Sequence, residues 1–173
     1  MRDDFSTAEP PSLGVFNGFE VYPMPAFATL QVHEIADVAA WYQKALGFRP
    51  MFTAPGPEGD PVLIHLRRRK YQDLLLIPAA SDAQAGPTSL TLSFSADEDI
   101  DALAERASSV PSVGRSKVEG PFDTPWNTRD LRVTDPAGHA IVLTSRRADP
   151  NPESWAAWQA RFKGGTPGAV PVR

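Results

Sequence analysis

Cysteine is absent from this 173-residue sequence, which excludes disulfides, thiolate metal sites and thiol nucleophiles. Histidine is scarce, with three residues, so a metal site built mainly from imidazoles is hard to assemble. Long apolar runs are also missing. The strongly apolar run from Leu74 to Ile77 is stopped by Pro78 and is far shorter than the roughly 20 residues that span a bilayer. A disulfide scaffold and a membrane-spanning helix are therefore not expected.

An excess of positive charge is lacking as well. The chain has 17 Lys and Arg against 21 Asp and Glu, a net charge of −4, so it lacks the long-range attraction that proteins binding nucleic acids or anionic membranes normally use. We expect neither as a partner. The first residues, Met1 to Asp4, lack the basic and apolar regions of a signal peptide, and we expect a cytoplasmic protein.

The remaining composition is that of a folded protein. Hydrophobic residues make up 42% and charged residues 22%, which is enough apolar material for a core. Proline is abundant, with 18 residues, and it gathers at turns and near both ends. The length allows one domain, or one domain built from two similar halves. Residues 1–25 are expected to form an N-terminal tail or arm, and residues 147–173 a C-terminal helix and tail.

A strand and a helix are predicted at the start of the first half. Residues 27–32 alternate in side-chain character, as a half-buried strand does, and an apolar stripe of helical spacing then runs from Val38 through Trp41 to Ala45. Gly47 is a suitable helix stop. Further strands are predicted at 48–53, 62–68 and 73–77.

The same order of strands and helix recurs 62 residues later. A shift of 62 positions aligns Leu30 with Leu92 and Trp41 with Leu103. A strand at 89–94 should turn Leu90, Leu92 and Phe94 toward a helix that ends near 108. We expect a capping box of Ser95 and Glu98 at the start of this helix. Strands follow at 113–118, 128–134 and 140–145, and a last helix, beginning near Asn151, carries an aromatic face of Trp155, Trp158 and Phe162.

Three motifs in these halves stand out: Trp41-Tyr42 followed by Leu46-Gly47-Phe48, the segment 125–129 and the turn 135–139. With them the sequence resembles the vicinal-oxygen-chelate superfamily, which includes glyoxalase I, extradiol dioxygenases and the fosfomycin- and bleomycin-resistance proteins. The resemblance covers residues 26–146. It implies an α+β fold of two β-α-β-β-β modules, residues 26–80 and 87–146, whose curved mixed sheets form a groove, often completed by a second subunit.

The resemblance also identifies the positions at which metal-dependent members hold a divalent ion with His and Glu. In this sequence those positions are Phe27, Leu75, Ser89 and Val142. A divalent cation needs imidazole or carboxylate ligands, so we expect no metal, no other cofactor and no catalytic residue of the family type.

The strand faces that turn away from the helices are predicted to form a ligand-binding surface. This surface mixes apolar and hydroxyl groups, which suits a sizeable neutral or aromatic molecule. Two aromatic residues of the 121–126 loop are added as a possible stacking platform at the groove mouth; for Trp126, the alternative is a plug that packs the loop onto the sheet. The candidate ligand-binding residues are Phe27, Gln31, His65, Leu75, Ser89, Thr91, Phe122, Trp126 and Val142.

Other ionisable residues have simpler interpretations. His33 is expected at a helix start and His139 in a turn, and His65 is the one histidine that could face the groove. The sequence suggests no carboxylate partner for any of them. The basic run 67–70 is expected at a solvent-exposed hairpin end rather than in a phosphate site.

Three functions remain open at this point. The first is a metal-independent binding protein that sequesters an antibiotic or other secondary metabolite, as bleomycin-resistance proteins do, and that forms a homodimer. The second is a lyase or isomerase that acts on a hydrophobic substrate without the family metal, with His65 as a candidate acid or base. The third is a regulatory domain whose groove is closed by the tails.

Overall fold

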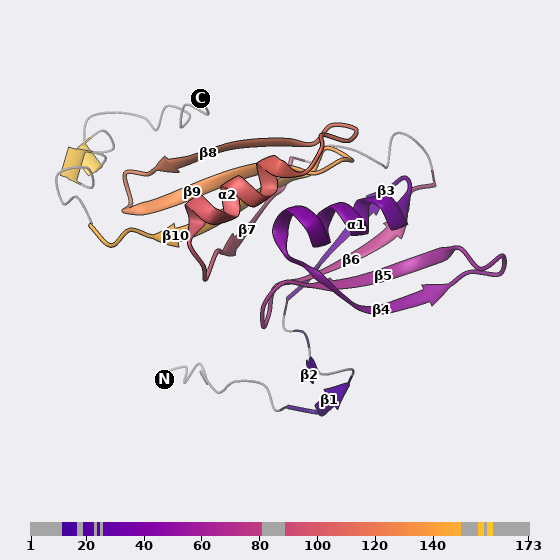
Figure 1. Ribbon diagram of the computed structural model, residues 1–173. Helices are drawn as coiled ribbons and strands as arrows, with labels where there is room; N and C mark the ends of the chain where they lie inside the picture. The colour runs from indigo at the N-terminus through magenta and orange to yellow at the C-terminus, as the bar shows by residue number, and fades with distance from the viewer. Residues whose placement is uncertain are drawn as a thin grey trace. The chain divides into compact units, whose positions relative to one another are not determined.

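The computed structural model describes residues 12–16, 19–22, 24, 26–80, 89–149, 156–157 and 159–160. By its internal contacts the chain divides into two compact units, Met1–Gly86 and Pro87–Arg173. Among the residues that the structure describes, each unit contains one long helix and one mixed four-stranded sheet, and Figure 1 shows both. The predicted α+β class and the repeated β-α-β-β-β order are confirmed.

The first unit contains β3 (Ala28–Val32), α1 (Ile35–Leu46), β4 (Arg49–Pro55), β5 (Pro61–Arg67) and β6 (Asp73–Pro78). The sheet order is β3-β6-β5-β4, with β3 parallel to β6 and the other pairs antiparallel. A short antiparallel hairpin of β1 (Gly14–Phe16) and β2 (Phe19–Val21) precedes this sheet. The N-terminal arm therefore contains a hairpin.

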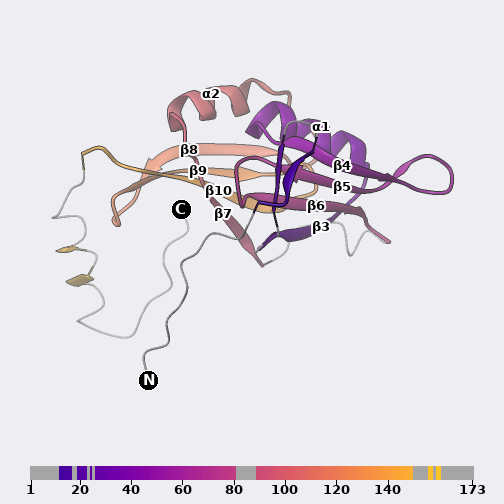
Figure 2. The same cartoon turned by 90° about the horizontal axis from the view of Figure 1, so that it is seen from below.

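The apolar stripe of α1 packs on one face of this sheet, as Figure 2 shows. Trp41 and Tyr42 are buried, and the Tyr42 ring meets that of Phe48 edge to face at 5.3 Å. The helix ends at Gly47, whose φ of 72° lies in the left-handed region that glycine adopts without steric cost. The stop predicted at Gly47 is correct.

The second unit contains β7 (Thr91–Ser95), α2 (Ile100–Ser109), β8 (Lys117–Asp123), β9 (Thr128–Thr134) and β10 (Ala140–Arg146). Its order, β7-β10-β9-β8, has one parallel pair, β7 with β10, as in the first unit. Helix α2 covers one face and buries Ile100 and Leu103. Leu131 and Leu143 are buried among the core residues of this unit.

Two local predictions in the second unit were wrong. The cap of α2 is Asp99, whose carboxylate accepts hydrogen bonds from the backbone N–H groups of Asp101 and Ala102. Ser95 instead donates to Asp97, and Glu98 pairs with Arg106. The capping box fails because Asp99 lies closer to the first helical turn and satisfies its free N–H groups.

The strand expected at 113–118 is displaced to β8. Residues 113–116 form a turn in which Ser116 Oγ accepts from Val113 N, and Gly114 has a φ of 57°. An extended strand cannot pass through that conformation.

The prediction that Leu90 faces the helix was also wrong. Leu90 precedes β7 and is 58% exposed, whereas Leu92 and Phe94 are partly buried.

The expected C-terminal helix lies largely outside the described residues. Ala156, Ala157, Gln159 and Ala160 are helical and exposed. Trp155, Trp158 and Phe162 fall outside, so the docking of their aromatic face stays a prediction. Within the described ranges, no helix is both long and apolar enough to cross a membrane.

Candidate functional site

The face of the first sheet opposite α1 carries four of the predicted ligand-binding residues. Along β6, Leu74 and Leu76 are buried toward the helix, whereas Leu75 alternates to the opposite face and is partly exposed. His65 lies opposite Leu75 in the β5–β6 register and therefore shares this face. We call this surface the first open face: Phe27, Thr29, Gln31, Phe52, His65, Leu75 and Ile77.

His65 has a carboxylate partner that the sequence analysis did not assign. Its Nε2 atom lies 2.7 Å from Oδ1 of Asp73 on the neighbouring strand, and Asp73 is 1% exposed. The expectation that the histidines lack carboxylate partners was wrong. The pair is eight residues apart in sequence, and the antiparallel β5–β6 register brings it together.

Asp73 is the centre of a larger cluster. Arg67 Nε donates to the same Oδ1 at 2.7 Å, and the Tyr22 hydroxyl donates to Oδ2 at 3.0 Å. Burial alone would raise the pKa of Asp73, but the hydrogen bonds from His65 and Arg67, the Arg67 charge and the Tyr22 hydrogen bond outweigh burial and hold it below its usual value. Asp73 therefore stays ionised and fastens the N-terminal arm to the sheet.

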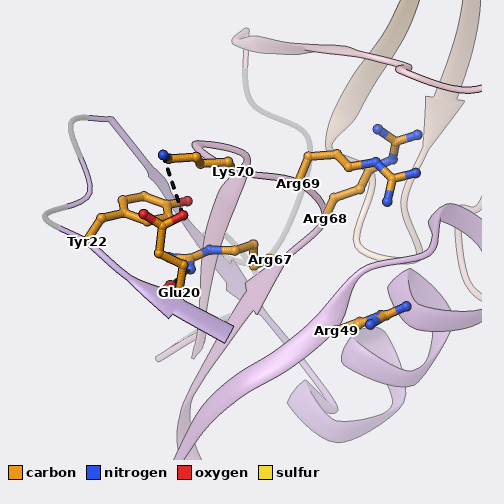
Figure 3. A pocket seen from close by; sticks show the side chains of 7 residues that line it. All are labelled: Glu20, Tyr22, Arg49, Arg67, Arg68, Arg69 and Lys70. Carbon is orange, nitrogen blue, oxygen red and sulfur yellow. Dashed lines mark hydrogen bonds and ion pairs between the residues drawn. The ribbon is translucent and has the colours of Figure 1, made fainter. Parts of the chain in front are cut away.

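The basic run 67–70 is also arranged differently from the prediction. Arg67 and Arg68 are 8% and 6% exposed, because their guanidinium groups bond to protein acceptors. Arg67 Nη1 donates to the Glu20 carbonyl, and Arg68 donates to the Leu46 carbonyl. The prediction of a solvent-exposed hairpin end is correct only for Arg69 and Lys70, whose side chains are exposed. Figure 3 shows the pocket that these side chains line.

The second sheet has a corresponding open face, opposite α2. Val142 and Thr144 on β10 alternate with the buried Ile141 and Leu143. In the register of the neighbouring strands, Val142 lies opposite Ser93 and Arg132. We call this surface the second open face: Thr91, Ser93, Phe122, Asp130, Arg132, Val142 and Thr144.

Asp130 and Arg132 are the members of this face that sequence analysis missed. Asp130 is 9% exposed, and its Oδ1 accepts hydrogen bonds from the hydroxyls of Thr128 at 2.8 Å and Thr144 at 2.7 Å. The Arg132 guanidinium lies 5.9 Å from the centre of the Phe122 ring. Strand alternation within residues 128–134 could have indicated both, because Leu131 and Val133 mark the opposite, buried face.

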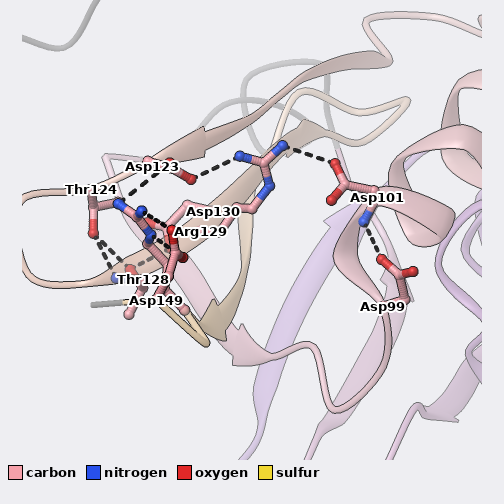
Figure 4. A network of polar contacts seen from close by, with 9 residues as sticks. Asp99, Asp101, Asp123, Thr124, Thr128, Arg129, Asp130 and Asp149 are labelled. Carbon is pink, nitrogen blue, oxygen red and sulfur yellow. Dashed lines mark hydrogen bonds and ion pairs between the residues drawn. The ribbon is translucent and has the colours of Figure 1, made fainter. Parts of the chain in front are cut away.

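On the helix side of the same sheet, Arg129 links three elements. Its two terminal nitrogens donate to Asp123 on β8 at 2.8 Å and to Asp101 on α2 at 2.9 Å (Figure 4). The hydrogen bonds to Asp101 and Asp123 raise the pKa of Arg129 further above its already high value. This network holds the start of α2 against the strands. Arg129 therefore lies on the helix side of the sheet, whereas its neighbour Asp130 lies on the second open face.

The predicted 121–126 loop is only partly a loop, because Phe122 lies on β8 and Trp126 in the turn that follows it; both side chains are exposed. Phe122 is 46% and Trp126 43% exposed. Trp126 lies in the turn between β8 and β9, which is closed by a hydrogen bond from Asn127 N to the Thr124 carbonyl. An indole exposed to this extent leaves aromatic surface for a ligand.

The four residues that the resemblance places at the family's metal-ligand positions do not fit a metal. Phe27 and Ser89 are exposed residues just before β3 and β7, and Leu75 and Val142 lie on the open faces. Hydrocarbon side chains and one hydroxyl cannot replace the water ligands of a divalent ion. Nor do three His, Cys, Asp or Glu side chains converge as a possible metal site anywhere in the part of the chain that the structure describes.

The other histidines lie away from the open faces. His139 is not a simple turn residue: it is 2% exposed, and its Nδ1 atom lies 2.9 Å from Oδ2 of Asp135. The other oxygen of Asp135 accepts from the backbone N–H groups of Gly138 and His139, so the pair fixes the turn before β10. His33 is exposed just before α1, as predicted.

Comparison with known families matches residues 25–143 to the model of the Glyoxalase/Bleomycin resistance protein/Dioxygenase superfamily. The chain belongs to this superfamily. Membership of the superfamily explains the paired modules and the parallel pair at one edge of each sheet. A comparison with curated proteins gave no match.

Solved structures with a similar fold include resistance and antibiotic-binding proteins. A glyoxalase/bleomycin resistance protein from Streptomyces sp. CB03234 is 25% identical, with a TM-score of 0.54 over 69% of this chain and 97% of that one. The bleomycin resistance determinant of transposon Tn5 is 20% identical, with a TM-score of 0.53 over 70% and 96%. The antibiotic-binding protein TnmS3, also from Streptomyces sp. CB03234, is 22% identical, with a TM-score of 0.50 over 68% and 90%.

Proposed function

We propose that this protein binds and sequesters a small organic molecule, an antibiotic or another secondary metabolite, without a metal ion. One observation supports the proposal: the residues that the resemblance places at the family's four ligand positions are Phe27, Leu75, Ser89 and Val142. Apolar and hydroxyl side chains at these positions favour burial of an organic surface over ion coordination. The names of the bleomycin resistance determinant and of TnmS3 supply the class of ligand.

The open faces offer the chemistry that such a ligand needs. Exposed aromatic side chains, such as Phe27, Phe52 and Trp126, supply flat apolar surface, and the hydroxyls of Thr91 and Ser93 supply hydrogen bonds. The Asp130 carboxylate is already held by Thr128 and Thr144, so it is a fixed acceptor for a donor group of the ligand. Arg132 adds one positive charge beside it.

A second candidate function rests on the pair of His65 and Asp73. A histidine oriented by a buried carboxylate is a common arrangement for a general acid or base, and the His65 side chain is 15% exposed. Nδ1 of His65 has no hydrogen-bond partner among the described residues, which leaves that atom for a substrate. The hypothesis of a lyase or isomerase requires that the bound molecule be chemically changed, whereas sequestration leaves it unchanged.

A ligand screen with product analysis separates the two functions. The purified protein is screened against a panel of aromatic natural products that includes bleomycin. Binding is detected first by thermal shift and is then measured by calorimetry with EDTA present. Binding to the folded state raises the melting temperature by mass action. Recovery of the ligand unchanged after prolonged incubation supports sequestration, whereas a new product that His65→Gln no longer forms supports the enzyme.

A further inference from the structure

We propose that the pocket at the end of β5 is an anion site that binds a phosphate or phosphomonoester dianion. This proposal does not rest on the proposed function, because none of the pocket's lining residues is among those named above for the two open faces. Arg67 adjoins the first open face, since it is the next residue after His65 on that side of β5. Its lining residues come from three segments, namely β2, the start of β4 and the end of β5 with the turn that follows (Figure 3): Glu20, Tyr22, Arg49, Arg67, Arg68, Arg69 and Lys70.

The pocket is lined mainly by positive charges, whereas the protein as a whole is negatively charged. Five of the seven lining residues are Arg or Lys, and one is a carboxylate, in a chain whose net charge is −4. Asp73 pairs with Arg67 and Glu20 with Lys70, and an added anion would further reduce the repulsion among the cations that line the pocket. Guanidinium groups match the oxygens of a phosphate in paired hydrogen bonds, so a tetrahedral dianion is the complementary ligand.

Two of the guanidinium groups are held in place before any ligand binds. Arg67 bonds to Asp73 and to the Glu20 carbonyl, and its Cζ atom lies 4.1 Å from the centre of the Tyr22 ring. Arg68 bonds to the Leu46 carbonyl and to Gln72. Fixed donors lose little side-chain entropy on binding, so these two form the rigid wall of the pocket.

Two other cations are available to the ligand. The side chains of Arg49 and Arg69 are exposed, and neither has an acidic partner among the described residues. The turn that carries Arg69 is closed by hydrogen bonds from Arg68 N to the Gln72 carbonyl and from Gln72 N to the Arg69 carbonyl. The sequence analysis noted the basic run but missed Arg49 and the arm residues, because they join it only in the fold.

The size of the pocket selects a small ligand. Its volume is about 250 Å³, below the roughly 300–1,000 Å³ of pockets that enclose drug-sized molecules but more than a bare phosphate needs. A phosphomonoester with a small organic group fits this space. A nucleic acid would need an extended basic stripe, which one compact pocket in an acidic protein does not supply.

The test is calorimetric titration of the full chain with inorganic phosphate and with phenyl phosphate, at constant ionic strength set with sodium chloride. We expect saturable binding of one anion per chain, tighter for phenyl phosphate. The double variant Arg49→Gln/Arg69→Gln should bind at least about tenfold more weakly, since two exposed charges facing a dianion together contribute on the order of 1.4 kcal/mol. The matched control, Lys44→Gln/Arg115→Gln, removes two exposed charges outside the lining and should bind as the wild type does.

A third variant works in the opposite direction and cannot be imitated by misfolding. Glu20→Gln removes the one carboxylate of the lining, which lies 3.5 Å from Lys70 Nζ, and keeps the backbone carbonyl that Arg67 uses. Affinity for phosphate should rise several-fold. No saturable phosphate binding, equal weakening in both double variants, or binding of long polyanions alone would overturn the proposal.

Discussion

Asp73 Oδ1 accepts two short hydrogen bonds at once, from His65 Nε2 and from Arg67 Nε, each 2.7 Å long. Its other oxygen accepts from the Tyr22 hydroxyl at 3.0 Å. A single buried carboxylate thus joins β5, β6 and the N-terminal arm. The cluster orients His65 on the first open face and fixes Arg67 in the wall of the basic pocket.

Replacing this carboxylate should lower stability in a pH-dependent way. Asp73→Asn leaves the Arg67 charge buried without its counter-ion, and breaking a buried ion pair from one side costs about 3 kcal/mol. The folded pKa of Asp73 lies below its ordinary value of 3.8. The carboxylate therefore stabilises the fold fully above that value, and the stabilisation is lost as the pH falls through the folded pKa.

Urea denaturation of the wild type and Asp73→Asn at several pH values measures this difference. The gap in the free energy of unfolding should be largest near pH 6 and should narrow on acidification below pH 4. Asp149→Asn is the matched control, because Asp149 is an exposed carboxylate paired with Arg147 and should change stability little. A gap for Asp73→Asn that stays constant down to pH 2 would contradict the role of the charge.

Trp126 gives a test of the ligand surface that is separate from stability. It is 43% exposed, so Trp126→Ala should lower the free energy of unfolding by less than about 1 kcal/mol. If the indole stacks on the ligand, affinity should fall by on the order of 1 to 3 kcal/mol. Calorimetry with a ligand from the screen and urea denaturation measure both on one variant.

Trp41→Ala is the contrasting control. Trp41 is 4% exposed in the α1 core, and truncating a buried tryptophan costs roughly 3 to 5 kcal/mol of stability. A stability loss of that size at Trp126, with unchanged ligand affinity, would mean that Trp126 is a structural plug and not part of the ligand site.

Gly114 tests the turn that replaces the predicted strand at 113–118. Its φ of 57° is strained for other residues, and an added Cβ would lie 2.5 Å from the Pro136 carbonyl oxygen. Gly114→Ala should destabilise the protein by about 2 kcal/mol or more. Gly59→Ala isolates the backbone contribution, since Gly59 has a φ of 93° and nothing within 4 Å of the added Cβ. Equal melting temperatures for the two variants would contradict the close approach at Gly114.

The predicted homodimer is tested by light scattering. The outer strands of the sheets, such as β4 and β8, present unpaired backbone groups, and Phe52 on β4 is 55% exposed. Exposed edges and aromatic side chains are common at subunit contacts. The expected mass is twice the chain mass of 18.8 kDa. A mass of one chain from micromolar to millimolar concentration would contradict the prediction.

Sequence periodicity predicted the fold well because it depends on burial. The alternation in 27–32 and the helical spacing of Val38 and Trp41 record which side chains enter the core, and the structure places Leu30, Val38 and Trp41 there. Element ends were less accurate. They depend on local hydrogen bonds, as the competition between Ser95 and Asp99 for the start of α2 shows.

The polar clusters could not be predicted from the sequence because they depend on strand register. Nothing local in the chain shows that Asp73 meets His65, or that Arg49 joins the basic run at 67–70. Both follow from antiparallel pairing. The facing of Asp130 and Arg132 could be predicted, since they alternate with Leu131 and Val133 on β9. Their role could not, because the sequence pattern of polar strand residues is the same whether they face solvent or a ligand.

Metal-independent sequestration is tested by calorimetric titration of the EDTA-treated protein with the natural-product ligand found in the screen. We expect one ligand to bind per chain with the same affinity before and after EDTA treatment, and the ligand to be recovered unchanged. Binding that vanishes with EDTA and returns with a stoichiometric divalent ion would contradict it. So would conversion of the ligand to a product.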